Sequence, residues 1–169
     1  MRHAEALFNA GNAFAERGVS AGAIAAFERA LKLLPGHPGL LINLGVQLDT
    51  AGHPDRAERC YRKVLQRRPN ELAALANLAQ LLFARERLAE ALPVYDRIVA
   101  VAPQAPTEIW NNRGVWQRRV RDSGAEASFR RALSLEPDSP QVLAHLGFLL
   151  CEPAALRRRT AVARAGALS

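Results

Sequence analysis

The chain has 169 residues, of which 49% are hydrophobic and only 6% aromatic. This apolar content excludes a disordered chain, and the many alanines favour close-packed helices over sheets. The formal net charge of +7 directs attention to acidic partners, including nucleic acid. No apolar run reaches the roughly 18 residues that a membrane-spanning helix needs, and the N-terminus lacks the apolar core of a signal peptide. We therefore expect a cytoplasmic, all-α protein.

Residues 38 to 71 show the predicted elements most fully. Apolar residues at helical spacing form one face of a first helix, namely Leu41, Leu44, Gly45 and Leu48. Gly52 predicts the end of that helix, and Pro54 predicts the first turn of a second one. The second helix ends at Pro69, because proline donates no backbone hydrogen bond and restricts the residue before it.

The same elements recur along the chain with a period of 34 residues. A proline closes each unit, at Pro35, Pro69, Pro103 and Pro137. Eight residues before each proline stands an aromatic residue, Phe27, Tyr61, Tyr95 or Phe129. Four residues before the aromatic residue stands an alanine, Ala23, Ala57, Ala91 or Ala125. Coincident columns at one period indicate an array of helix pairs that bury a continuous core between them.

This pattern resembles the tetratricopeptide repeat family, whose 34-residue helix-turn-helix unit carries Leu-Gly in its first helix and A-x3-F, then proline, in its second. The resemblance implies an all-α fold, an α-solenoid of stacked helix pairs in a right-handed superhelix, as a single domain over residues 1–169. We expect repeats at 4–37, 38–71, 72–105 and 106–139, and the first helix of a fifth repeat at 140–151. Because an array leaves its last apolar face uncovered, we also expect a capping helix at about residues 154–165.

The fourth repeat has two possible registers around the segment WNNRGVW, which spans residues 110–116. In a strict frame, Arg113 occupies the slot that holds Gly45 in the second repeat. In a frame shifted by one residue, Gly114 fills that slot and Trp110 matches the leucine slot of the other first helices. We favour the shifted frame, because two helices approach closely only where side chains are small. Trp116 is then either a core or a groove residue.

The chain lacks the motifs that carry catalysis, phosphate binding or metal coordination. Its four histidines are scattered without metal-ligand spacing. Cys60 and Cys151 are also far apart, so we expect both to be buried, reduced thiols. We therefore predict that the protein is not an enzyme and holds neither a cofactor nor a metal ion.

An asparagine column is the most informative polar feature of the first helices. It stands two residues after the leucine slot and consists of Asn9, Asn43, Asn77 and Asn112, followed by His145. Asparagine is mildly unfavourable in mid-helix, so its recurrence suggests a role. The first helices of such an array line its concave surface, where carboxamides match the N–H and C=O groups of an extended peptide. The column resembles that of O-GlcNAc transferase-like proteins, and this resemblance implies that the asparagine side chains bind peptide backbones.

The expected peptide-binding groove includes further residues of the same helices. The complete predicted set is Asn9, Asn12, Asn43, Val46, Asn77, Gln80, Asn112, Arg118, Arg119 and His145. The arginines make one end of the expected groove basic, whereas Glu5, Glu16 and Asp49 make the other end acidic. The alternative interpretation is that the asparagines hydrogen-bond between neighbouring repeats.

The predicted function is a non-catalytic protein–protein interaction module that binds a protein or peptide segment. One alternative is a recruitment domain of a larger bacterial glycosyltransferase or sulfotransferase. A second is a basic helical repeat that binds nucleic acid, which is less favoured because Arg56, Arg59 and Arg62 lie on a second helix and face outward. Self-association through an uncovered end of the array is a third possibility, and no membrane partner is expected.

Overall fold

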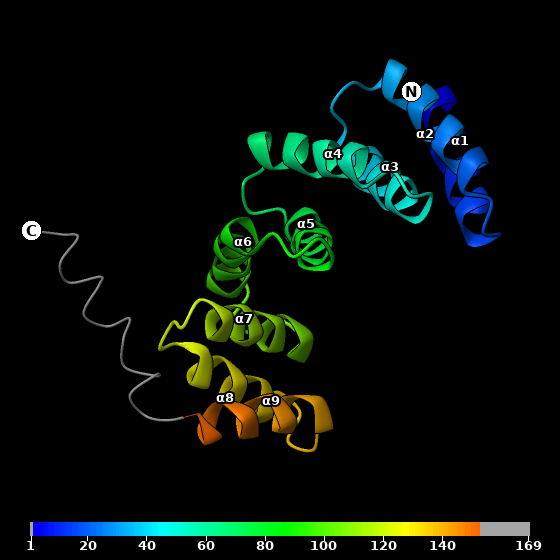
Figure 1. The fold of residues 1–169 in the computed structure, drawn as a ribbon. Helices are drawn as coiled ribbons and strands as arrows, with labels where there is room; N and C mark the ends of the chain where they lie inside the picture. Colours follow the sequence, from blue (N-terminus) through cyan, green and yellow to red (C-terminus); the bar gives the residue numbers. More distant parts are fainter. Residues whose placement is uncertain (1, 153–169) are drawn as a thin grey trace, which may run out of the picture. The chain divides into compact units, whose positions relative to one another are not determined.

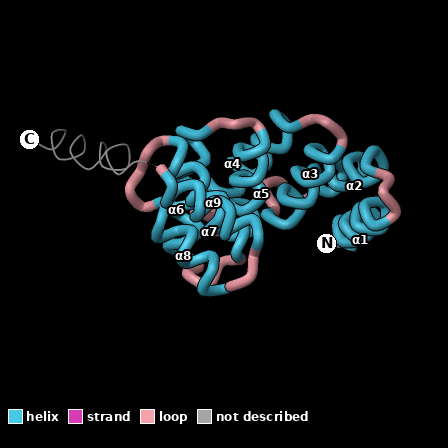
Figure 2. Tube along the Cα trace, turned by 60° about the horizontal axis from the view of Figure 1, so that its bottom comes forward, coloured by secondary structure: helices cyan, strands magenta, loops and turns pink. Residues whose placement is uncertain are grey.

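The computed structural model describes residues 2–152 and confirms the all-α prediction (Figure 1). The described residues form α-helices joined by short turns, without a strand (Figure 2). The helices are α1 (Arg2–Glu16), α2 (Ser20–Leu33), α3 (Pro38–Thr50), α4 (Pro54–Arg67), α5 (Leu72–Ala84), α6 (Leu88–Val101), α7 (Thr107–Arg119), α8 (Ala125–Leu135) and α9 (Pro140–Cys151). The capping helix expected at about 154–165 lies outside the described residues.

Proline and glycine set several of the helix ends. Pro38, Pro54 and Pro140 each occupy the first turn of a helix, where the missing N–H group costs nothing. Gly18 and Gly52 follow the first helices of repeats one and two with φ angles of 71° and 79°. These left-handed angles suit glycine, because it has no Cβ atom to clash.

The corresponding turns of repeats three and four use other residues. Glu86 and Arg121 adopt φ angles of 53° and 58°, although neither is glycine. A side chain in this region strains the backbone. The sequence alone does not signal these two left-handed positions, because neither residue is a glycine.

In repeats one, two and four the two helices pack closely on each other, as expected for an array of helix pairs. The aromatic column is buried, with Phe27, Tyr61, Tyr95 and Phe129 at most 2% exposed. The alanine column is also buried, with Ala23, Ala57, Ala91 and Ala125 at most 1% exposed. Small side chains at this second column allow the two helices of a repeat to approach closely.

The chain divides into two compact units, Met1–Arg85 and the part from Glu86 onward. In the first unit, α3 contacts both α1 and α5, so the first helices of successive repeats form one layer. In the second unit, α7 and α9 contact each other in the same way. No helix in the described part of the chain is long and apolar enough to cross a membrane.

Candidate functional site

In α1, α3 and α7 one glycine faces an aromatic ring of the following helix, and this contact fixes the register of the helix. A Cβ atom on Gly11 would overlap the Phe27 ring, and one on Gly45 would lie 2.5 Å from the Tyr61 ring. A Cβ atom on Gly114 would lie 2.6 Å from the Phe129 ring, which is the same relationship. Gly114 therefore occupies the glycine slot, and the shifted register of the fourth repeat is confirmed.

The first unit brings two of the predicted asparagines together. The Asn43 Nδ2 atom donates a hydrogen bond of 2.9 Å to Asn12 Oδ1, and both side chains are half-buried. This bond links α1 to α3, so the alternative of asparagines bonding between neighbouring repeats holds for this pair. Asn77 is half-buried, and the remaining predicted residues of this unit, Asn9, Val46 and Gln80, are exposed.

Asn112 makes a different contact in the second unit. Its side chain hydrogen-bonds to the hydroxyl of Tyr95, whose ring fills the aromatic column of the third repeat. Burial raises the pKa of Tyr95 to about 12, and the bond from Asn112 acts in the opposite direction. Asn112 thus provides a hydrogen-bond partner for the buried phenol group of Tyr95.

His145 pairs with a residue outside the predicted set. The His145 Nδ1 atom lies 2.8 Å from Oδ1 of Asn111, so the tautomer protonated at Nδ1 donates this bond. Asn111 is only 3% exposed, although its neighbour Asn112 fits the asparagine column. The one signal in the sequence was the doubled asparagine of WNNRGVW, where the two residues occupy different faces of α7.

The environment of His145 predicts a dependence of stability on pH. Burial, and secondarily the charge of Arg118, lower the pKa of His145 below its ordinary value of 6.5. The unfolded chain then binds more protons than the folded chain between the two pKa values, so stability falls as the pH drops below about 6.5. Thermal unfolding followed by circular dichroism from pH 7.5 to 5 should show this fall. His145→Gln should reduce it, and His3→Gln, at an exposed position, should not; equal pH profiles for the two variants would contradict the assignment.

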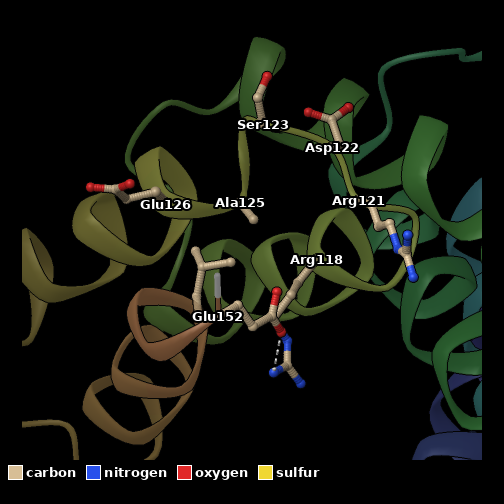
Figure 3. Close-up of a pocket in the computed structure, with 8 residues that line it drawn as sticks. Arg118, Arg121, Asp122, Ser123, Ala125, Glu126 and Glu152 are labelled. Atoms are coloured by element: carbon tan, nitrogen blue, oxygen red, sulfur yellow. Dashed lines mark ion pairs between the residues drawn. The ribbon is translucent and has the colours of Figure 1, made fainter. Parts of the chain in front are cut away.

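The two predicted groove arginines already have partners within the second unit. Arg118 forms an ion pair of 3.5 Å with Glu152, drawn as a dashed line in Figure 3. Arg119 lies 3.5 Å from Glu86, and its guanidinium stacks 5.0 Å from the centre of the Trp116 ring. Trp116 is 1% exposed, which resolves the open question in favour of a core residue.

The pocket beside Arg118 has mixed charge. It lies between the turn after α7, the start of α8 and the end of α9 (Figure 3). Arg118 and Arg121 contribute positive charge to its lining, and Asp122, Glu126 and Glu152 contribute negative charge. Such a lining does not select one sign of charge, so the pocket gives no support for a uniformly basic end of a groove.

A buried polar network in the fourth repeat was not predicted. Arg113 donates hydrogen bonds to Asp96 Oδ1 at 2.8 Å and to Ser128 Oγ at 2.6 Å. The Ser128 Oγ atom also lies 2.6 Å from the side-chain amide of Gln117. Ser128 is fully buried and Gln117 is 3% exposed. The other repeats have apolar side chains at the positions of Arg113, Gln117 and Ser128. The signal for the network in the sequence is the arginine at position 113, where the second and third repeats have leucine.

The two cysteines differ in their exposure. Cys60 is half-buried, and burial raises the pKa of its thiol. Cys151 is exposed, so the prediction of a buried thiol is wrong for this residue. It sits at the last position of α9, beyond the residues that pack on α8. Within residues 2–152, no group of three or more His, Cys, Asp or Glu side chains could hold a metal ion.

Comparison with known proteins places this geometry in a family. A tetratricopeptide repeat family model matches residues 2–38 and 43–106, which is more than half of the chain. Over 84 residues the chain is 40% identical to cellulose synthase operon protein C of Xanthomonas axonopodis pv. citri (strain 306), a match that covers 50% of this chain and 6% of that protein. Over 122 residues it is 30% identical to protein FlbA of Caulobacter vibrioides, covering 72% of this chain and 20% of that protein. The chain thus spans at most 20% of the length of these two relatives.

Solved structures show the same fold. MamA 41-end from Desulfovibrio magneticus RS-1 superposes with a TM-score of 0.79 at 25% identity, covering 86% of this chain and 82% of that one. YrrB superposes with a TM-score of 0.72 at 22% identity, covering 83% and 73% of the two chains. The chain belongs to the tetratricopeptide repeat family, whose fold indicates a protein–protein interaction module.

Proposed function

We propose that the first unit binds an extended segment of a partner protein through the layer formed by α1, α3 and α5. The observation that carries this proposal is the Asn12–Asn43 pair. Its hydrogen bond uses the Nδ2 group of Asn43 and the Oδ1 atom of Asn12. The Nδ2 group of Asn12 and the Oδ1 atom of Asn43 are left to bind a ligand. An adjacent donor and acceptor match the C=O and N–H groups of one peptide unit.

The pair is also preorganised for this task. Each asparagine holds the other in place across two helices, so less side-chain entropy is lost when a peptide binds. Asn9 and Asn77 extend the column on either side, and the exposed Val46 and Gln80 add apolar and polar contact area. A bound backbone would thus meet carboxamides from three successive first helices. The resemblance of this column to that of O-GlcNAc transferase-like proteins supports the same proposal.

The second unit offers fewer side chains for hydrogen bonds to a peptide backbone. Asn112 is hydrogen-bonded to Tyr95, and His145 is hydrogen-bonded to Asn111. Arg118 and Arg119 would have to exchange their ion pairs for ligand contacts. We therefore assign backbone recognition to Asn9, Asn12, Asn43 and Asn77 of the first unit.

Removal of the asparagine pair tests this function. Each hydrogen bond contributes only about 1 kcal/mol net, so we expect micromolar peptides and a loss of roughly 30-fold for the Asn12→Ala/Asn43→Ala double variant. Peptides would be selected from a random 15-residue display library on the wild-type protein, and their affinities measured by fluorescence anisotropy. Gln66→Ala, at an exposed position on α4, serves as the control.

A second measurement separates backbone from side-chain recognition. N-methylation of single peptide bonds in a selected peptide should weaken binding at one or two positions, because it removes the N–H group that donates to Asn43 Oδ1. Equal binding of every selected peptide to the double variant and to the wild type would exclude the proposed recognition of the peptide backbone by these asparagines.

A further inference from the structure

The first unit, Met1–Arg85, carries its net positive charge on one helix. Residues 54–68, which comprise α4 and the residue after it, contain six Arg or Lys residues and two acidic residues. Their formal net charge is therefore +4. The other residues of the unit contain five Arg or Lys residues and five acidic residues, so their charges balance. The positive charge of the first unit is thus concentrated on α4 and does not reflect a general excess of arginine.

Four of the basic residues lie on one side of α4. Arg56, Arg59, Lys63 and Arg67 follow the spacing i, i+3, i+7 and i+11, which places them along one face of an α-helix, and we call them the α4 stripe. All four are exposed. The buried residues of α4 lie on the opposite side, where the helix packs on α3 and α5. At a rise of about 1.5 Å per residue, the stripe is about 16 Å long.

Neighbouring carboxylates neutralise only part of the α4 stripe. Arg56 forms an ion pair of 2.6 Å with Glu28 of α2. The two carboxylates of α4 itself pair with arginines outside the stripe. Arg59 and Lys63, at the centre of the stripe, form no ion pair with another described residue. Exposed cations of this kind attract an anionic partner over about 8 Å at physiological ionic strength.

The side chains around the stripe favour phosphate groups over a protein surface as the partner. Stable protein–protein interfaces have an apolar core with aromatic or aliphatic anchors. No large hydrophobic side chain of α4 is exposed, so this helix offers no such anchor. Arginine guanidinium groups, in contrast, match the geometry of phosphate oxygens and bind them with paired hydrogen bonds.

The same surface favours a duplex over a single strand. Proteins that bind single-stranded nucleic acid stack the bases on exposed aromatic side chains. The one aromatic residue of α4, Tyr61, is 2% exposed and belongs to the core. A duplex keeps its bases stacked on each other and presents its phosphates outward, so cations alone are sufficient to hold it.

We propose that the α4 stripe binds the phosphate backbone of double-stranded nucleic acid without selecting its base sequence. Duplex DNA presents one negative charge for about every 1.7 Å of its axis, so a stripe of about 16 Å meets several phosphates. Contacts to phosphates position a protein on a duplex but carry no sequence information directly. The asparagines proposed to bind a peptide lie on the first helices, so this surface is separate from that site and the inference does not rest on the proposed function.

Charge reversal on the stripe tests this inference with the full-length chain. The probe is a fluorescein-labelled DNA duplex of about 20 base pairs, titrated by fluorescence anisotropy in about 50 mM salt. We expect a dissociation constant on the order of 10 μM and a slope of about −3 for the logarithm of the association constant against that of the salt concentration. Arg59→Glu/Lys63→Glu should weaken binding by about tenfold or more, and the neutral Arg59→Gln/Lys63→Gln by a smaller factor.

Arg2→Glu/Arg17→Glu is the matched control for the reversed charges. It changes the net charge of the chain by the same amount, at two exposed positions of the same unit, on α1 and directly after it. Because charges outside the contact region are screened by salt, its affinity for the duplex should stay within about threefold of the wild type.

Four results would overturn the proposal. Equal losses in the two charge-reversed variants would show that only the overall charge of the chain matters. Unchanged binding of Arg59→Glu/Lys63→Glu would show that other cations hold the duplex, such as the four arginines within residues 153–169. Tighter binding of a single strand of the same length would exclude a duplex as the preferred partner. Equal or tighter binding of a labelled polyglutamate peptide would identify an acidic protein segment as the partner instead.

Discussion

Gly45→Leu is expected to lower the free energy of unfolding of the first unit by about 3 kcal/mol, because overpacking a close-packed interior displaces neighbours that have nowhere to move. The first added atom, Cβ, would lie 2.5 Å from Cε1 and 2.8 Å from Cζ of the Tyr61 ring. Tyr61 is 2% exposed, so its ring cannot swing into solvent. The expected result is a large shift of the urea midpoint, followed by circular dichroism.

Gly147→Leu is the matched control for this variant. It makes the same substitution at the same slot of a first helix, but no described atom lies within 4 Å of the new Cβ position. Leucine is a better helix former than glycine, by up to about 0.8 kcal/mol, so the control should be neutral or slightly stabilising. If Gly45→Leu unfolded at the urea concentration of the wild type, the close contact between Gly45 and the Tyr61 ring would not be a packing constraint.

Arg113→Leu is expected to cost about 2 kcal/mol, even though it restores the leucine found at this slot in Leu44 and Leu78. The arginine bonds to Asp96 and to Ser128, and Ser128 lies within hydrogen-bond distance of Gln117. Its removal leaves buried polar groups with fewer partners, which costs more than the new apolar packing contributes. Urea unfolding of the variant measures this loss.

The triple variant Arg113→Leu/Gln117→Leu/Ser128→Ala separates the two contributions. It replaces Arg113, Gln117 and Ser128 by residue types that other repeats hold at these slots, as in Leu44, Leu48 and Ala26, and leaves only the half-exposed Asp96. Apolar replacement of a complete buried network is often neutral, so the triple variant should lie within about 1 kcal/mol of the wild type. Arg130→Ala, which breaks an exposed pair with Glu126, should cost at most about 0.5 kcal/mol. A triple variant as unstable as Arg113→Leu would show that the network is not the cause.

The asparagine column shows which features of the candidate site the sequence period predicts and which it does not. Its spacing predicts which residues share a face of the first helices, since that depends only on helical geometry. Periodicity says nothing about which polar group satisfies another. Asn43 hydrogen-bonds to Asn12, whereas Asn112 hydrogen-bonds to Tyr95 and Asn111 to His145. These pairings join residues that are 17 to 34 positions apart and depend on the rotation of each helix.

The sequence by itself determined the repeat and its core. The glycine, alanine, aromatic and proline columns recur at one period, because each repeat must present the same small and large surfaces to its neighbours. These features are local or periodic, so they can be read without a structure.

Only the tertiary structure decided which side chains meet across helices. It placed Gly114 against Phe129, buried Trp116 and joined Arg113 to Ser128. Among the described residues, it also left Leu143 and Gly147 of α9 without the helix cover that Leu41 and Gly45 have. The physical reason is that hydrogen bonds and ring contacts are sensitive to shifts of about 1 Å, which a one-residue change of register exceeds.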